Sequence, residues 1–144
     1  MHDNKELVEE ENLFEKDIFI FENGLYGFEH LRRFVFINRS KNPDNPFKLM
    51  ISLDNSNISF VVVSPFEICK DYEIDIEDLE LNKIGVAQSS DIIVLSIVTL
   101  SKENISLNLK SPIILSLATN KAKQIILKDD RYDTKHTINL LNKC

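Results

Sequence analysis

The sequence predicts an all-β domain, either an antiparallel sandwich or a barrel, with one short helix. Two observations predict this class. Short runs rich in Ile, Val and Phe recur along the chain, and turn-forming residues separate them. A single acidic segment, residues 75–85, has the residue spacing of a helix instead. Because 144 residues suit one domain and no internal repeat is present, a single domain accounts for the chain.

The strand pattern is cleanest in segment 47–53, where apolar side chains alternate with Lys48, Met50 and Ser52. This alternation predicts a strand that is buried on one face only. Four turn formers connect it to the β-branched segment 58–64, and the two runs together predict a hairpin. In chain order the predicted strands are 17–22, 34–38, 47–53, 58–64, 92–100, 105–110, 113–118, 124–128 and 137–141.

The helix is predicted from the pattern within segment 75–85. Asp75 is placed to cap the first turn, and Gly85 is placed to end the helix after about two turns. A second backbone signal is Gly24, which is expected to supply a positive φ in the turn that follows the first strand.

The two ends of the chain differ in character. Residues 1–16 are rich in charge, and they are predicted to form an N-terminal extension that frays or adds an edge strand. Residues 17–144 are predicted to form the β domain. The N-terminus lacks the basic and apolar regions of a signal peptide, and no apolar run reaches the roughly 18 residues of a membrane span. A cytoplasmic protein with reduced thiols at Cys69 and Cys144 is therefore expected.

Composition bears on the class of partner. The formal net charge is −6, from 17 Lys and Arg against 23 Asp and Glu. Direct nucleic-acid binding is not expected, because a basic face is its usual footprint. A negative protein suits a basic protein partner better.

Catalytic and cofactor motifs are missing from the sequence. No glycine-rich phosphate loop opens a helix, and no serine stands in a G-x-S-x-G elbow. We therefore predict no catalytic, cofactor-binding or metal-binding residues and no cofactor.

The acidic segment 71–80 contains six carboxylates, which makes it a candidate for metal binding. Counted from Asp71 as a calcium loop, it lacks both the glycine at the sixth position and the glutamate at the twelfth. Tyr72, Ile74 and Ile76 alternate with the acids, which is typical of a strand with one solvated face. The segment is therefore either a solvated acidic face or an acidic docking surface for a basic protein, and metal binding is the third option.

The ordered motifs resemble a known family. GLYGFEHLRRFVF at 24–36 and PFKLMISLDNSNISFVVVSPF at 46–66 resemble the opening half of the bacterial flagellar assembly factor FliW. DYEIDI at 71–76, NLKSPIIL at 108–115 and YDTKH at 132–136 follow in that family's order. The resemblance covers roughly residues 17 to 138.

The resemblance implies a fold and a function. The fold would be a single antiparallel β-barrel-like domain with one or two short helices. The function would be that of a non-enzymatic regulator that binds CsrA, a small basic RNA-binding dimer that represses flagellin translation. Proteins of this family also bind flagellin, and the two partners compete in a switch. A monomer is expected when the protein is free.

Two surfaces are predicted to contact partners. Asp71, Tyr72 and Glu73, with Pro65 and Phe66 at the margin, are predicted to meet CsrA: the acids would steer the encounter and an aromatic anchor would supply affinity. Tyr72 could equally be a core aromatic residue. The second surface comprises Asn108, Lys110 and Pro112, although Asn108 could instead satisfy backbone groups at a turn and Pro112 could begin a strand.

Two alternative functions remain open at the level of sequence. One is a chaperone that binds flagellin alone through an apolar groove. The other is a metal-dependent hydrolase that uses the carboxylates of segment 71–80 with His30 or His136.

Overall fold

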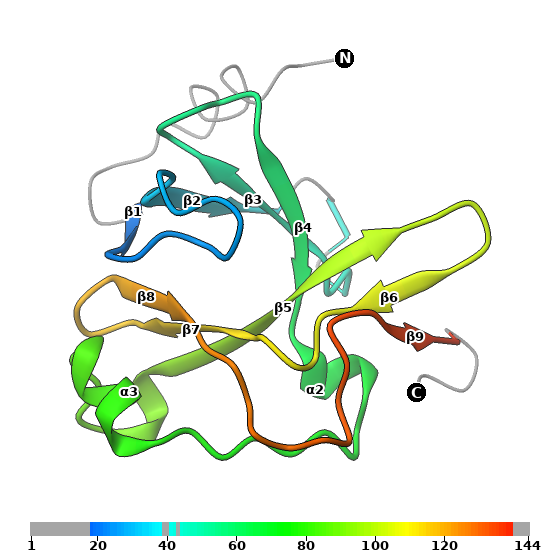
Figure 1. The fold of residues 1–144 in the computed structure, drawn as a ribbon. Coiled ribbons are helices and arrows are strands. Elements are labelled where there is room, and N and C mark those ends of the chain that lie inside the picture. Colours follow the sequence, from blue (N-terminus) through cyan, green and yellow to red (C-terminus); the bar gives the residue numbers. More distant parts are fainter. Residues whose placement is uncertain (1–17, 39–40, 43, 140–144) are drawn as a thin grey trace.

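The structure is a computed structural model that describes residues 18–38, 41–42 and 44–139. Figure 1 shows the strands gathered around one barrel, with the short helices and two long connections outside it. The strands are β1 (Ile18–Phe21), β2 (Arg33–Ile37), β3 (Lys48–Ser52), β4 (Ser59–Val63), β5 (Ile92–Leu100), β6 (Ile105–Leu107), β7 (Ile113–Ser116), β8 (Lys121–Gln124) and β9 (His136–Ile138). The helices are α2 (Pro65–Ile68), α3 (Asp78–Lys83) and the 3₁₀ turn η2 (Ser89–Asp91).

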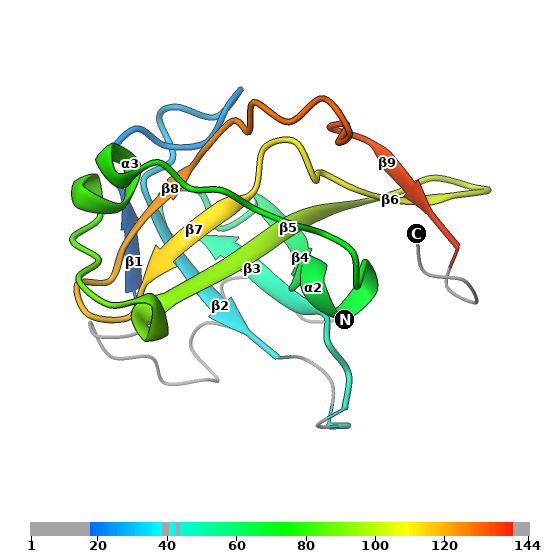
Figure 2. The same cartoon turned by 90° about the horizontal axis from the view of Figure 1, so that it is seen from below.

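Seven strands close the barrel in the order β4, β3, β2, β1, β8, β7 and β5, because β5 pairs back onto β4. All pairings are antiparallel except the one between β1 and β8, where Ile20 lies opposite Lys121. The all-β barrel class and its few short helices are thus confirmed. β6 and β9 extend the sheet beyond the barrel as the arm visible in Figures 1 and 2.

β5 is the longest strand and holds the barrel and the arm together. Its first half pairs with β7 along one edge, and its last residues pair with β6 along the same edge. β6 and β7 therefore follow one another along the same edge of β5, and residues 108–112 separate the two strands. This segment belongs to one of the two predicted partner surfaces.

The barrel core is built by alternation along each strand. Side chains that point inward include Phe21, Phe34, Met50, Val62 and Leu95, all buried. The prediction of one polar face on segment 47–53 is wrong, since Met50 and Ser52 have no exposed surface. The reason is closure: one face of β3 lines the barrel, while Ile51 on its other face belongs to a separate buried cluster with Val35 and Ile37.

A second core lies outside the barrel, and we call it the outer core. It packs the outer faces of β5, β6 and β7 against α2, the chain from 69 to 86 and the chain from 125 to 132. Figure 1 shows these two connections running beside each other at the bottom of the molecule, between α3 and α2. The residues predicted to bind partners lie in and around this outer core.

Several predicted elements differ in their bounds, and for two of them the contacts show why. β8 ends at Gln124, so the strand predicted at 124–128 is misplaced. Pro112, opposite Ile125, has no N–H to donate, and the Lys110 N–H donates to the Asp133 carbonyl oxygen instead, so the ladder between these segments is only half made. The helix starts at Asp78 after Glu77, and no side chain caps it. Asp75 does not cap it because the preceding chain is extended, with Ile74 and Ile76 packed on the outer core.

Some predictions fall on the ends of the chain. The extension 1–16 and the residues from 140 onward lie outside the described residues. The predicted reduced thiols fall on Cys69, which is buried, and on Cys144, which lies outside the described residues. The positive φ of Gly24 is confirmed at 66°. Within the described ranges, no helix has the length and apolar character needed to cross a membrane.

Candidate partner-binding surface

The structure brings the two predicted surfaces together through Tyr72. Its hydroxyl donates a hydrogen bond to the carbonyl oxygen of Leu109 at 2.8 Å, so the chain near residue 72 is joined to segment 108–112. Its ring lies 4.7 Å from the Tyr132 ring and 5.5 Å from the Phe66 ring, measured between centroids. The rings of Phe66, Tyr72 and Tyr132 therefore form one cluster with Tyr72 in the middle.

Tyr72 itself is only 5% exposed. Burial raises the pKa of its hydroxyl, and Tyr132 and Asp129 nearby raise it further. The placement favours the core role for Tyr72, because a buried ring that donates inward presents little surface to a partner. Phe66 is the aromatic residue at this place that reaches the solvent, with 41% of its surface exposed.

The remaining residues of the first surface differ in exposure. Pro65 is buried as the first residue of α2, whereas Asp71 and Glu73 are exposed. Glu73 is held in place through its backbone, since its N–H donates to the Tyr132 hydroxyl at 2.9 Å. Two carboxylates beside an exposed phenylalanine thus form a small surface that can meet a partner, defined here as the Phe66–Glu73 surface (Phe66, Asp71 and Glu73).

Segment 108–112 has roles within the fold. Asn108 accepts a hydrogen bond on Oδ1 from the Ser111 N–H at 2.9 Å, which closes the turn between β6 and β7. Lys110 Nζ donates to the Asp129 carbonyl oxygen at 3.0 Å. Pro112 is buried and directly precedes β7. Each of these contacts fits the structural alternative stated from the sequence, and Lys110 also ties this segment to the chain at 129–131.

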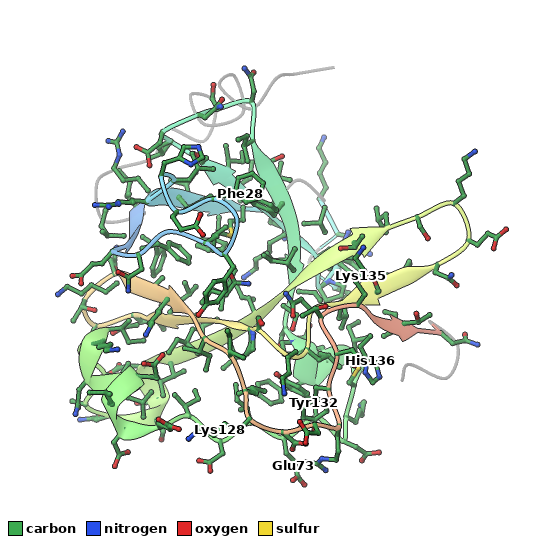
Figure 3. The ribbon with its side chains drawn as sticks, in the orientation of Figure 1. Phe28, Glu73, Lys128, Tyr132, Lys135 and His136 are labelled. Atoms are coloured by element: carbon green, nitrogen blue, oxygen red, sulfur yellow. The ribbon has the colours of Figure 1, made fainter. Side chains whose placement is uncertain are left out.

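That chain contributes residues that the sequence did not single out for a site. Arg131 pairs with Asp129 at 2.6 Å and lies 5.2 Å from the centroid of the Tyr132 ring. The hydrogen bonds from Arg131 lower the pKa of Asp129 to about 2. Arg131 also approaches Glu73 at 3.5 Å. No periodic pattern marks this irregular segment, so only the YDTKH resemblance pointed to it. Figure 3 shows Tyr132 and Glu73 side by side at the bottom of the molecule.

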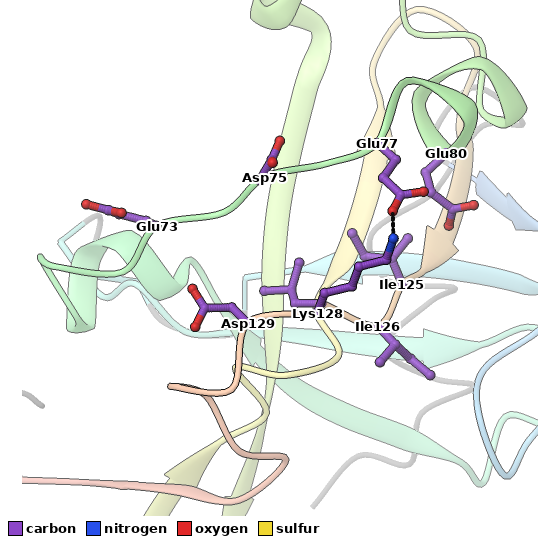
Figure 4. A pocket seen from close by; sticks show the side chains of 9 residues that line it. Glu73, Asp75, Glu77, Glu80, Ile125, Ile126, Lys128 and Asp129 are labelled. Carbon is purple, nitrogen blue, oxygen red and sulfur yellow. Dashed lines mark ion pairs between the residues drawn. The ribbon is translucent and has the colours of Figure 1, made fainter.

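A groove of about 510 Å³ runs beside this surface, between the chain at 73–80, which ends in the first turn of α3, and the chain at 125–129. We call it the acidic groove (Figure 4). Its apolar lining consists of Ile125, Ile126 and Leu127. Its carboxylates are Glu73, Asp75, Glu77, Glu80 and Asp129, and Lys128 is the cation among the lining residues.

Two carboxylates that line the acidic groove form close ion pairs. Lys128 Nζ lies 2.7 Å from Glu77 Oε1 at the rim. At the end near α3, Lys123 pairs with Glu80 at 2.7 Å, and both side chains are largely shielded from water. The hydrogen bond from Lys123 is the main reason that the pKa of Glu80 is lowered, against the opposing effect of burial.

The groove offers little to the hydrolase alternative. Among the described residues, no group of three or more His, Cys, Asp or Glu side chains is arranged to hold a metal ion. Neither His30 nor His136 lines the groove. The arrangement is one of charged rim and apolar floor, which suits the binding of another chain.

Comparison with known proteins identifies the family. The model of the FliW protein family matches residues 3–138. The chain belongs to the FliW family. The flagellar assembly factor FliW of Clostridium novyi is 38% identical over 126 residues, which are 86% of this chain and 87% of that protein. The FliW of Bacillus velezensis is 43% identical over the same shares of the two chains.

A solved FliW structure agrees with the fold. The crystal structure of a flagellar assembly factor FliW superposes with a TM-score of 0.79 and 32% identity, covering 87% of each chain. The resemblance drawn from the ordered motifs is thereby confirmed, and the family assigns this FliW protein a role in flagellar assembly.

Proposed function

We propose that this FliW protein binds CsrA and antagonises its repression of flagellin mRNA, and that flagellin competes for the protein in a partner switch. It would act in the cytoplasm, where the mRNA is translated, as a monomer and without catalysis. Membership of the FliW family supports a role in flagellar assembly, which is the process that this switch would regulate. The negative charge of the surface over the outer core supports a basic protein as the partner.

The observation that carries the proposal is the row of exposed carboxylates along one connection. In the chain at 71–77 the acids point outward while Ile74 and Ile76 are packed on the outer core. The row therefore has fixed positions on a folded support. A fixed row of negative charge accelerates association with a basic protein and disfavours acidic competitors. CsrA, as a basic dimer, is the partner of the switch that such a surface fits.

A competition experiment tests the proposal. Purified CsrA and purified flagellin are each mixed with the tagged FliW protein, first separately and then together. We expect each to be retained alone and flagellin to displace CsrA as its concentration rises. Retention of flagellin alone would favour the flagellin-only chaperone, and failure to retain CsrA at low salt would refute the proposed switch.

The consequence for translation is measured separately. In a cell-free translation reaction, CsrA should reduce flagellin synthesis, and adding the FliW protein should restore it. Adding an excess of flagellin should then reduce synthesis again. A FliW protein that binds CsrA but leaves repression intact would contradict antagonism while keeping the binding.

A further inference from the structure

An open backbone edge borders the acidic groove. The N–H groups of Ile125 and Leu127 donate to the carbonyl oxygens of Pro112 and Lys110, at 3.0 and 2.8 Å, so this chain continues the direction of β8 beside β7. In an extended chain, successive N–H groups point to opposite edges. Those of Ile126 and Lys128 therefore point away from β7, and within the part of the chain that the structure describes neither donates a hydrogen bond.

The edge is open because the neighbouring strand ends early. β1 pairs with β8 only at Lys121 and Ala122, and the chain after Phe21 then turns away. Beyond that point, within the described residues, no strand pairs with the chain at 125–128 on this edge, and Ile126 and Lys128 line the acidic groove. An unpaired edge of this kind is a template for an added strand.

The opposite wall of the groove is tied down at both ends. The Glu73 N–H is bound by the Tyr132 hydroxyl at one end, and Glu80 is bound by Lys123 at the other. Between these ties, Asp75 and Glu77 line the groove. A strand lying on the open edge would thus pass beside carboxylates whose positions are fixed.

Lys128 already places a positive charge in this groove. It extends from the open edge to Glu77, as Figure 4 shows, and its side chain is 89% exposed. An ion pair as exposed as this contributes little to stability and exchanges readily with another cation. Ile126, the neighbouring residue on the edge, leaves 58% of its apolar surface in water.

We propose that the acidic groove binds an extended segment of a partner protein in which basic residues alternate with aliphatic ones. The segment pairs with the Ile126 and Lys128 N–H groups as an added strand, and one of its basic side chains replaces Lys128 at Glu77. An aliphatic side chain of the segment covers Ile126. This inference rests on the proposed function, because it assigns a site to a protein that works by binding others.

The first test uses amide hydrogen exchange with a synthetic probe. The probe is a capped peptide of four Lys-Val repeats, and a Glu-Val peptide of equal length is the control. In the free protein the amides of Ile126 and Lys128 should exchange fast, while those of Ile125 and Leu127 are protected. The Lys-Val peptide should protect Ile126 and Lys128, and the Glu-Val peptide should not. Binding without this protection, or no binding, would overturn the proposal.

Lys128 gives the second test, with Lys102 in the β5–β6 turn as a matched control. Lys128→Ala and Lys102→Ala change the net charge equally, and both side chains are exposed. Because Lys128 competes for Glu77, Lys128→Ala should tighten peptide binding by about two- to fivefold. Lys102→Ala should leave it nearly unchanged. If the two variants changed peptide binding equally, the effect would come from net charge alone, and the proposal would be contradicted.

Ile126 separates backbone pairing from side-chain contact. Ile126→Ala keeps the N–H, whereas Ile126→Pro removes it at a position where the N–H serves no described partner. Ile126→Pro should weaken peptide binding by about fivefold beyond Ile126→Ala. Thermal unfolding checks that both variants fold. Equal binding by two folded variants would exclude strand addition.

Failure here is distinguishable from failure of the proposed function. CsrA and flagellin retention by Ile126→Pro is measured beside that of the unchanged protein. If both partners are retained while the peptide never binds, the groove proposal fails and the switch stands. If CsrA is never retained, the switch fails. Protection of Ile126 and Lys128 that rises with protein concentration alone would assign the edge to a second copy of the chain.

Discussion

Tyr72 and Leu109 join the chain at 69–86 to segment 108–112, because the tyrosine hydroxyl donates to the leucine carbonyl oxygen at 2.8 Å. Both residues are buried, so water cannot replace the donor. This hydrogen bond fixes the depth of Tyr72 and thereby places Asp71 and Glu73 on either side of it at the surface.

Replacing Tyr72 with phenylalanine should lower the free energy of unfolding by about 1–2 kcal/mol, because the Leu109 carbonyl oxygen is left buried without a donor. Denaturant unfolding followed by circular dichroism measures the change. Tyr132→Phe is the matched control and should cost less, since its hydroxyl accepts from the N–H of the exposed Glu73. If the Tyr72→Phe protein were as stable as the original, the Tyr72–Leu109 hydrogen bond would contribute nothing to the stability of the fold.

Charge reversal at Asp71 and Glu73 together should weaken CsrA binding, mainly through slower association, because both carboxylates are exposed and act at long range. Surface plasmon resonance separates the two rate constants. Thermal stability should hardly change. Reversal at Asp44 and Glu103, which are exposed elsewhere, gives the same change in net charge and serves as the control. Unaltered affinity at low salt would exclude the Phe66–Glu73 surface.

Acid should loosen the attachment of α3 to β8. The Lys123 hydrogen bond lowers the pKa of Glu80 below its ordinary value of 4.5. A carboxyl group with a lowered pKa stabilises the fold fully above its unfolded value, and this stabilisation disappears as pH falls through the folded value. Glu80→Gln should therefore cost about 1 kcal/mol at pH 7 and progressively less as the pH falls below 4.5. Thermal unfolding of both proteins across this range tests it, and a constant difference would contradict it.

Gly24 and Gly27 allow a comparison of backbone strain with steric conflict. Both have a positive φ, 66° and 86°. A Cβ on Gly24 would lie 2.5 Å from the Glu29 carbonyl oxygen, while one on Gly27 would meet nothing within 4 Å. Gly27→Ala should cost about 1–2 kcal/mol from its φ alone, and Gly24→Ala clearly more. Similar losses in denaturant unfolding would mean that the Glu29 backbone can move aside.

Val62 tests the interior of the barrel. Its side chain is fully buried among the inward-pointing residues. Val62→Ala should therefore cost about 1–3 kcal/mol through the lost methyl groups and the cavity they leave. Leu100→Ala in the exposed part of β5 is the control and should change the unfolding free energy little. A negligible effect at Val62 would contradict the placement of β4 in the barrel wall.

The sequence by itself determined where most strands lie. β5 occupies the predicted residues 92–100, and β1 to β4 lie within one residue of the predicted runs. Side-chain alternation and turn formers are local signals, so they survive in a single sequence. The ordered motifs also sufficed to identify the family. The alternation of acids with Tyr72, Ile74 and Ile76 is also a local pattern, so the sequence alone indicated a row of exposed carboxylates.

Only the tertiary structure decided which faces are buried and which groups meet. Closure of the barrel buried Met50, although its neighbours alternate as on a half-exposed strand. Pro112 has no N–H to donate to the ladder opposite Ile125, so strand β8 ends at Gln124 although segment 124–128 has a strand-like sequence. The acidic groove joins residues about 50 positions apart in the chain. Such pairings depend on the path of the whole backbone, which no local pattern records.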